Sequence, residues 1–538
     1  MDPITVDLHF PRAGIDQSKA YGKQPARPVG GGRYARTTQV ATNVRGLQFD
    51  TLRARGGSRP GLSKYVDTQV AGTEFVVQEL AVFVGSGFDP PGAIMSQQSQ
   101  SGRVVLLVAV AEGDVYVKAP PAGGGWTAAS NVSGDTPPLN FSGIMYSANN
   151  NQKMYFADGV NFKKYDPHTN EVSDWAATAG SLPVDSEGNA PRLICTWRGR
   201  TVLSGLLLDP QNWFMSAVSD PTDFDYGAAG FPPTMAVAGN NSSLGLIGDV
   251  VTGLCPYSDD VLIFFGDHTI YMMRGDPMAG GSINLVSDAI GGAWGIPWTK
   301  DPAGAVYFVS NQTGIYSLVP GQVPQLISRA IDSLLRTTDT GENVLRLQWS
   351  EQERGLYLFI TPAAEPSETL HYFWEPDTGG GWYQVAFGDT DFNPLCCCVL
   401  DGNEPTDRVA LVGCWDGYVR FFDYTATTDD GVPIESEVWI GPILTTSMDE
   451  VRLDELQAVL GEASGDVTWG VVTGTTAEEA LGNSPEVTGT WSGGRNLTEF
   501  VRRAGHAIYL RMTSTARWAM ESVRARYTPL GKVRRRGR

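Results

Sequence analysis

The chain has 538 residues, and its composition excludes a helical bundle: 63 residues are Gly and 33 are Pro, 10% are aromatic, and only 18% are charged. Gly and Pro mark tight turns, while aromatic residues suit half-buried strands, so this composition predicts many short strands. The chain is too long for one ordinary core, which indicates a repeat array or several domains.

Charge is segregated along the chain, although the net charge is −19. Residues 1–64 hold 11 basic and 4 acidic residues, and residues 524–538 hold 7 basic residues and no acidic one. Residues 65–523 carry 22 basic and 55 acidic residues. This pattern excludes a nucleic-acid reader that uses its main surface. It fits an acidic wall past which DNA slides, with basic ends that dock on acidic partners, and equally a surface that keeps a large protein soluble.

The beginning of the chain predicts neither secretion nor membrane insertion. Met1–Asp7 has no basic stretch followed by an apolar one, so we expect no signal peptide. No run reaches the roughly 18 apolar residues of a spanning helix. The six cysteines show neither zinc-type spacing nor a disulfide framework. We therefore expect buried cysteines in a protein made in a reducing cytoplasm, with Cys396 and Cys398 on one face of a strand and Cys397 on the other.

Residues 1–65 are predicted to form an extended basic arm. Apolar periodicity is weak there, and Arg53–Leu62 is a cationic, glycine-rich turn. A phosphate-binding loop would end in Gly-Lys-Ser/Thr between a strand and a helix, which this turn does not. We interpret it as an interaction segment. The candidate interaction residues are Arg53, Arg55 and Arg59, with Arg534, Arg535 and Arg536 at the other basic end.

Residues 66–440 repeat one pattern, in which a short apolar run, a polar turn and an aromatic-rich run follow each other, as in a β-hairpin. Five such hairpins are 104–108 with 115–117, 153–156 with 162–165, 261–265 with 269–272, 305–309 with 315–318, and 409–413 with 418–422. Units begin about 40–60 residues apart, the spacing of four-stranded blades. We predict an all-β protein with a β-propeller of about seven blade-like units, and one surface helix over 327–336.

The pattern changes after residue 440. Residues 441–538 contain apolar strands over 467–472, 506–512 and 518–527, followed by the basic end. They predict a small C-terminal β-sandwich with a basic tail.

No catalytic, cofactor or metal site is predicted. The five histidines are dispersed, and no Gly-x-Ser-x-Gly elbow is present. The carboxylates of 220–226 are expected to form a turn with Asx hydrogen bonds, with a calcium site as the alternative. Arg274-Gly275-Asp276 is expected to be a tight turn. A glycosidase propeller is the enzyme alternative, but the repeated Ser-x-Asp-x-Gly-x-x-Trp turns of sialidases are missing.

Several stretches, taken in order, resemble the propeller-containing tail nozzle or hub proteins (tail tubular protein B-like) of short-tailed bacteriophages. They are Arg55–Leu62, Tyr155–Gly159 with Lys164–Pro167, Asn212–Ser216 with Asp220–Asp225, and Phe265–Tyr271 with Arg274–Pro277. The resemblance covers about residues 43–330, and this chain is shorter than many members of that family.

The resemblance implies a virion structural protein and no enzyme. It implies a homohexameric ring in the phage tail, below the portal and adaptor, which conducts viral dsDNA without reading its sequence and anchors fibres or spikes. Two alternatives stay open: a carbohydrate-binding or glycoside-hydrolase propeller at the tail tip, and a WD40-like interaction scaffold. Residues 413–423 look like one WD40 blade end, but they occur once.

Overall fold

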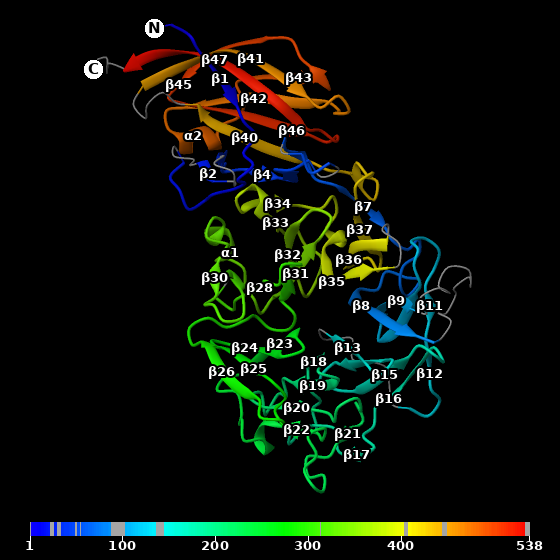
Figure 1. Ribbon diagram of the computed structural model, residues 1–538. Coiled ribbons are helices and arrows are strands. Elements are labelled where there is room, and N and C mark those ends of the chain that lie inside the picture. The colour runs from blue at the N-terminus through cyan, green and yellow to red at the C-terminus, as the bar shows by residue number, and fades with distance from the viewer. Residues whose placement is uncertain are drawn as a thin grey trace.

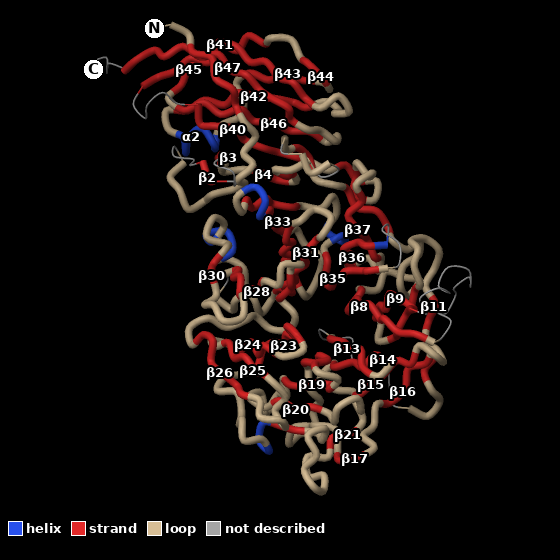
Figure 2. Tube along the Cα trace, viewed as in Figure 1, coloured by secondary structure: helices blue, strands red, loops and turns tan. Residues whose placement is uncertain are grey.

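The computed structural model describes residues 2–21, 26–28, 34–48, 51–53, 55–87, 103–135, 145–312, 314–402, 407–443 and 449–532. Strands dominate these residues (Figure 2). Helix is confined there to two α-helices, α1 (Asp332–Leu335) and α2 (Ala477–Gly482), and three 3-10 turns at Gly239–Asn241, Pro376–Thr378 and Thr390–Phe392. None of the described helices is long and apolar enough to cross a membrane.

Seven antiparallel sheets follow one another in a ring and form a β-propeller (Figure 1). Blades 1 to 3 are β8 (Val77–Ser86), β9 (Arg103–Ala111), β10 (Asp114–Lys118) and β11 (Thr127–Ala128); β13 (Tyr146–Asn150), β14 (Lys153–Ala157), β15 (Phe162–Asp166) and β16 (Glu171–Asp174); and β18 (Leu193–Trp197), β19 (Arg200–Ser204), β20 (Trp213–Met215) and β22 (Val237–Ala238). Short strands beside them are β12 (Ser130–Asn131), β17 (Ala179–Gly180) and β21 (Asp223–Phe224).

The remaining four blades complete the ring. Blades 4 to 6 are β23 (Val251–Ser258), β24 (Val261–Gly266), β25 (Ile270–Arg274) and β26 (Ser282–Ser287); β27 (Trp298–Lys300), β28 (Val306–Val309), β29 (Ile315–Leu318) and β30 (Gln325–Leu326); and β31 (Asn343–Ser350), β32 (Gly355–Pro362), β33 (His371–Glu375) and β34 (Gly381–Val385). Blade 7 is β35 (Pro394–Asp401), β36 (Arg408–Cys414), β37 (Val419–Asp423) and β7 (Gly61–Lys64), with β38 (Thr428–Asp429) and β39 (Val432–Pro433) at its edge.

The five predicted hairpins are all confirmed, and each is the second and third strand of a blade. The second strands pack between neighbouring blades, so both their faces are apolar: β9 and β24 are buried along almost their whole length, whereas the third strands β10 and β15 alternate between buried and partly exposed residues. A blade cannot cover its own two faces, and packing against its neighbours buries them. Phe265 of blade 4 packs against Phe308 of blade 5, with ring centroids 5.0 Å apart.

The ring closes through a strand from far earlier in the sequence. β7 pairs antiparallel with β37, in the register Phe421↔Ser63, and supplies the fourth strand of blade 7. The first strands of blades 7 and 1, β35 and β8, then lie against each other. β7 directly precedes blade 1 in the sequence and pairs with blade 7 in the structure. This sheet therefore links the first blade to the last one.

A two-sheet sandwich follows the propeller. One sheet holds β1 (Ile4–Leu8), β47 (Met520–Lys532), β41 (Asp449–Leu460), β44 (Gly494–Arg495) and β45 (Glu499–Gly505). The other holds β40 (Ser436–Ile443), β46 (Ala507–Ser514), β42 (Val467–Gly474) and β43 (Val487–Trp491). Trp469 stacks on Trp491 between them, with centroids 5.5 Å apart. β40 begins at Ser436, so this sandwich starts a few residues before the predicted boundary at residue 441.

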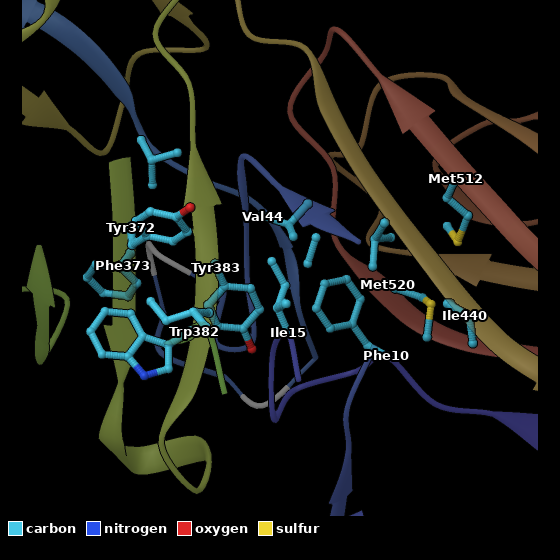
Figure 3. Close-up of a cluster of buried hydrophobic side chains, with 14 of the residues drawn as sticks. Phe10, Ile15, Val44, Tyr372, Phe373, Trp382, Tyr383, Ile440, Met512 and Met520 are labelled. Atoms are coloured by element: carbon cyan, nitrogen blue, oxygen red, sulfur yellow. The ribbon is translucent and has the colours of Figure 1, made fainter. Parts of the chain in front are cut away.

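The N-terminal arm is extended, as predicted, but it does not project from the molecule. It packs between propeller and sandwich: β4 (Ala41–Thr42) pairs with β34 of blade 6 and with β40. One sheet therefore runs from blade 6 into the sandwich. β5 (Val44–Arg45) pairs with β6 (Gly57–Ser58), and β2 (Ala26–Pro28) with β3 (Tyr34–Arg36). Figure 3 shows arm side chains between both units: Phe10, Ile15 and Val44 lie between Trp382 and Tyr383 on one side and Met512 and Met520 on the other.

Candidate functional surfaces

Arg59 does not lie on an interaction surface, and the prediction that placed it there is wrong. Its side chain is fully buried and forms an ion pair with Asp429, with Nη2 2.5 Å from Oδ2 and Nη1 2.9 Å from Oδ1. Its other hydrogen-bond donors reach the Asn43 side chain and the Ala386 carbonyl. Arg59 therefore joins the arm, blade 6 and the edge strand β38 of blade 7, and no donor faces a partner.

Of the other candidate arginines, one is exposed, one is half-buried and three lie outside the described residues. Arg53 is exposed and lies in an isolated bridge with Gln48. Arg55 is half-buried, and its guanidinium donates to Gln48 and pairs with Glu521 of β47. Arg534, Arg535 and Arg536 lie outside the described residues. The structure thus brings Arg55 and Arg59 to the contact between arm and body, where each binds another part of the same chain.

A second buried arginine was not predicted. Arg45 lies under the arm, with Nε 3.2 Å from Glu353 Oε1 and Nη2 donating to the Tyr357 hydroxyl over 2.9 Å. Its guanidinium stacks 3.9 Å from the centre of the Phe373 ring. Beside this group, burial raises the pKa of the Glu375 carboxyl to about 7, although the backbone N–H of Leu47 lowers it. The arm is therefore fastened to blade 6 by buried polar contacts, which require a defined geometry.

Side chains from opposite blades fill the propeller axis at one level. Arg346 of β31 lies over the ring of Tyr146 of β13, 5.4 Å from its centroid, although these strands belong to blades 6 and 2. Glu79 of β8 accepts a hydrogen bond from Ser147 over 3.2 Å. Burial raises the pKa of Glu79 to about 7, and Arg346 opposes that rise. These three large side chains are all buried, so no open passage for a nucleic acid crosses the axis at this level.

A groove of about 960 Å³ lies where blade 6, the arm and the sandwich meet. Its sandwich wall is polar: Glu437, Thr513 and Thr468 face each other across β40, β46 and β42. Arg511 binds Glu437 with its Nε at 2.7 Å and stays more than a third exposed. Phe387 and Val432 line the opposite wall. A guanidinium, carboxylates and hydroxyls beside an apolar wall can recognise a polar ligand such as a sugar.

The two motifs expected to be turns are turns. Asp220 accepts from the backbone N–H and hydroxyl of Thr222, and Asp223 accepts from the backbone N–H of Asp225, which are Asx turns. Asp276, of the Arg-Gly-Asp tripeptide, accepts from the Met278 N–H and pairs with Arg200 over 3.2 Å. Both motifs are occupied by contacts within blade 3 and its neighbour. No group of three or more potential metal ligands occurs among the described residues.

Comparison with known proteins finds likeness to solved structures only. No family model and no curated protein matches the chain. Among solved structures, it is similar to YCF48, in a complex with a D1 peptide, with 11% identity, a TM-score of 0.39, and coverage of 69% of this chain and 99% of that one.

Two further similar structures are larger bacterial proteins. The extracellular domain of a putative hybrid two-component system of B. thetaiotaomicron shows 12% identity and a TM-score of 0.44; the match covers 83% of this chain but 55% of that one. PorZ of Porphyromonas gingivalis shows 11% identity, a TM-score of 0.35, and coverage of 74% and 44%. The chain thus spans about half the length of these two proteins. None of the three is described as part of a phage tail, so that assignment stays a prediction.

Proposed function

We propose that the protein is a structural component of a bacteriophage tail, a nozzle or hub ring that conducts DNA and anchors fibres below the portal and adaptor. The resemblance of its motif order to such proteins is the origin of this proposal. The observation that supports it best is the sheet that joins blade 6 through β4 to the sandwich, because continuous strand pairing fixes the propeller and the sandwich to each other. A ring component needs such rigidity between its contact surfaces.

The route for DNA in this proposal lies between copies of the chain. Side chains of blades 1, 2 and 6 fill the propeller axis at the level of Arg346, so the lumen belongs to the assembly. The body between residues 65 and 523 has 33 more acidic than basic residues, and a negative wall repels the phosphates of passing DNA. In this proposal, contacts between copies form the ring and the acidic wall repels the DNA phosphates, without a catalytic step.

Location in particles tests the proposal. An antibody against the purified chain is expected to label one end of short phage tails in negatively stained particles, with one site per particle. Antibody labelling of a host lysate that contains no phage particles serves as the control. Labelling of host structures alone, with none on particles, would contradict the proposal and favour a cellular scaffold of the WD40-like kind.

A second candidate function is carbohydrate binding in the groove at the junction. The hydroxyl row Thr513–Thr468 beside Arg511 and Glu437 supports it. Binding of host-surface glycans to the full chain by calorimetry is the test, with Arg511→Gln as the variant that removes the guanidinium and Arg53→Gln as the exposed control. Binding lost in Arg511→Gln only would favour this function, and no saturable binding to any glycan would exclude it.

A further inference from the structure

One face of the propeller is an ordered surface made of loops from blades 2 to 5. We define this loop face as residues 158–161, 182–192, 205–211, 244–250, 266–268 and 288–294, which join second to third strands or one blade to the next. Hydrogen bonds connect each loop to its neighbour. Ala190 donates to the Gly159 carbonyl, Leu208 to the Asp185 carboxylate, and Ile247 to the Gln211 carbonyl. Such loops lose little conformational freedom when a partner binds.

The loop face exposes apolar side chains that nothing in the described chain covers. At least 36% of each of these side chains is accessible: Val160, Val184, Leu207, Leu208, Leu246 and Trp294. Single exposed apolar residues are ordinary, but a group on one face marks an interaction site. Trp294 lies beside Gly205, where an added Cβ would be 3.2 Å from its ring, so loops of two blades contribute to one patch.

The loop face is also strongly acidic. Its six segments hold seven acidic residues and one basic residue, Arg192, for a net charge of −6. Asp185 and Asp249 accept several neutral N–H donors, which order the turns without cancelling the charge. Glu187 and Asp288 are exposed. The partner that this surface fits is therefore basic, with apolar groups for the leucines and a cation for the face of Trp294.

Residues 524–538 have the complementary chemistry, with seven basic residues and no acidic one. Exposed apolar side chains lie beside them: Ile4 on β1 pairs opposite Tyr527, and Leu530 is 45% accessible. The first of these basic residues, Arg524 and Arg526, form only exposed ion pairs with Asp7 and Glu455, which contribute little to stability and leave the guanidinium charge available.

The described part of this basic segment, residues 524–532, does not lie on the loop face of its own chain. β47 is held between β1 and β41 in the sandwich, and Figure 1 shows it at the opposite end of the molecule from β20 and β22 of blade 3. We propose that residues 524–538 of one copy dock on the loop face of the next copy. Such a contact joins two different surfaces, so it repeats head to tail and closes into a ring when the rotation allows. The closure of the ring rests on the function proposed above.

Charge exchange tests the contact in the full chain. In sedimentation velocity, the variant Glu187→Lys/Asp288→Lys is expected to weaken self-association about tenfold or more, as is Arg534→Glu/Arg535→Glu/Arg536→Glu. Combining both sets restores opposite charges and is expected to recover association. The control Asp259→Lys/Glu351→Lys changes exposed acids in turns between first and second strands, on the other face, and is expected to leave association unchanged. An assembled oligomer indifferent to the first two variants would overturn the docking while leaving the proposed function intact.

A second pair tests the apolar contribution, and a peptide tests whether residues 524–538 bind the loop face. Leu207→Asp is expected to weaken association, whereas Leu285→Asp, equally exposed on the outer strand β26, is not. A labelled peptide of residues 524–538 is expected to bind the full chain at low salt, to dissociate at 0.5 M NaCl, and to lose affinity for Glu187→Lys/Asp288→Lys. A full chain that stays monomeric would refute both the docking between copies and the ring, whether or not the peptide binds. Equal binding to wild type and variant would refute docking.

Discussion

Replacing Arg59 tests whether the arm holds the closed propeller together. The guanidinium makes five hydrogen bonds, two of them to Asp429, and both side chains of this pair have 0% accessibility. Arg59→Met keeps most of the apolar stem but leaves the Asp429 carboxylate buried without its cation. Breaking one partner of a buried ion pair costs about 3–5 kcal/mol, so we expect the free energy of unfolding to fall by about 4 kcal/mol.

The measurement is urea-induced unfolding at pH 7, followed by tryptophan fluorescence. Arg59→Met/Asp429→Asn is expected to recover about half of the loss, since the buried charge is gone while an acceptor for the Gly388 N–H stays. Arg53→Met, on the exposed side of the same turn, is the matched control and should change the free energy by less than about 0.5 kcal/mol. The reasoning is refuted if Arg59→Met unfolds at the same urea concentration as the control.

Three further predictions concern buried titratable groups and a crowded glycine. Burial lowers the pKa of His371 to about 4, below its usual 6.5. The folded protein therefore loses about 3 kcal/mol of stability as the pH falls from 6.5 toward 4, because the unfolded chain takes up the proton first. The unfolding free energy of His371→Gln is expected to change less over this pH range than that of the wild type. Burial raises the pKa of Glu375 to about 7, so its ionisation destabilises the fold as the pH rises through 7. The variant Glu375→Gln should therefore be more stable than the wild type by about 2–3 kcal/mol at pH 8 and nearly as stable as the wild type at pH 4.5. An equal stability difference at the two pH values would refute this prediction. Gly14→Ala is expected to lower the melting temperature far more than Gly72→Ala, although both glycines have φ near +70°. An added Cβ at Gly14 would lie 2.3 Å from the Trp382 carbonyl oxygen, whereas one at Gly72 would have no atom within 4 Å. Equal shifts of the melting temperature in calorimetry would show that the close approach of Gly14 to Trp382 contributes nothing.

The sequence was sufficient for the blades whose middle hairpin has a short polar turn. In blades 1, 2, 4, 5 and 7 the two strands are joined by a few residues rich in Asp, Asn and Gly, and the second strand is apolar because it is buried between blades. Blades 3 and 6 lack that signal, because residues 205–212 and 363–370 separate their second and third strands. The three consecutive cysteines divide as predicted: Cys396 and Cys398 pack in one core and Cys397 faces another.

Contacts between distant residues could not be predicted from local pattern. β7 pairs with residues more than 350 positions later in the chain. Arg59 binds Asp429, which is 370 positions away, so the sequence around Arg59 does not show that its side chain is buried. The helix predicted over 327–336 is reduced to α1 because Ile327 and Ser328 hydrogen-bond to Ile315 of blade 5 and hold the start of the segment extended. The loop face was equally hidden, since its six segments are brought together only by the circular order of the blades.

Native mass spectrometry of the full chain is the most direct test of the central claim that this protein assembles into a tail ring. We expect one closed species, of about 350 kDa for six copies of the 57.9 kDa chain, that persists on dilution and dissociates when the salt concentration rises. A chain that stays at 57.9 kDa at every concentration, or that grows into filaments of unlimited mass, would show that this protein does not form a closed ring.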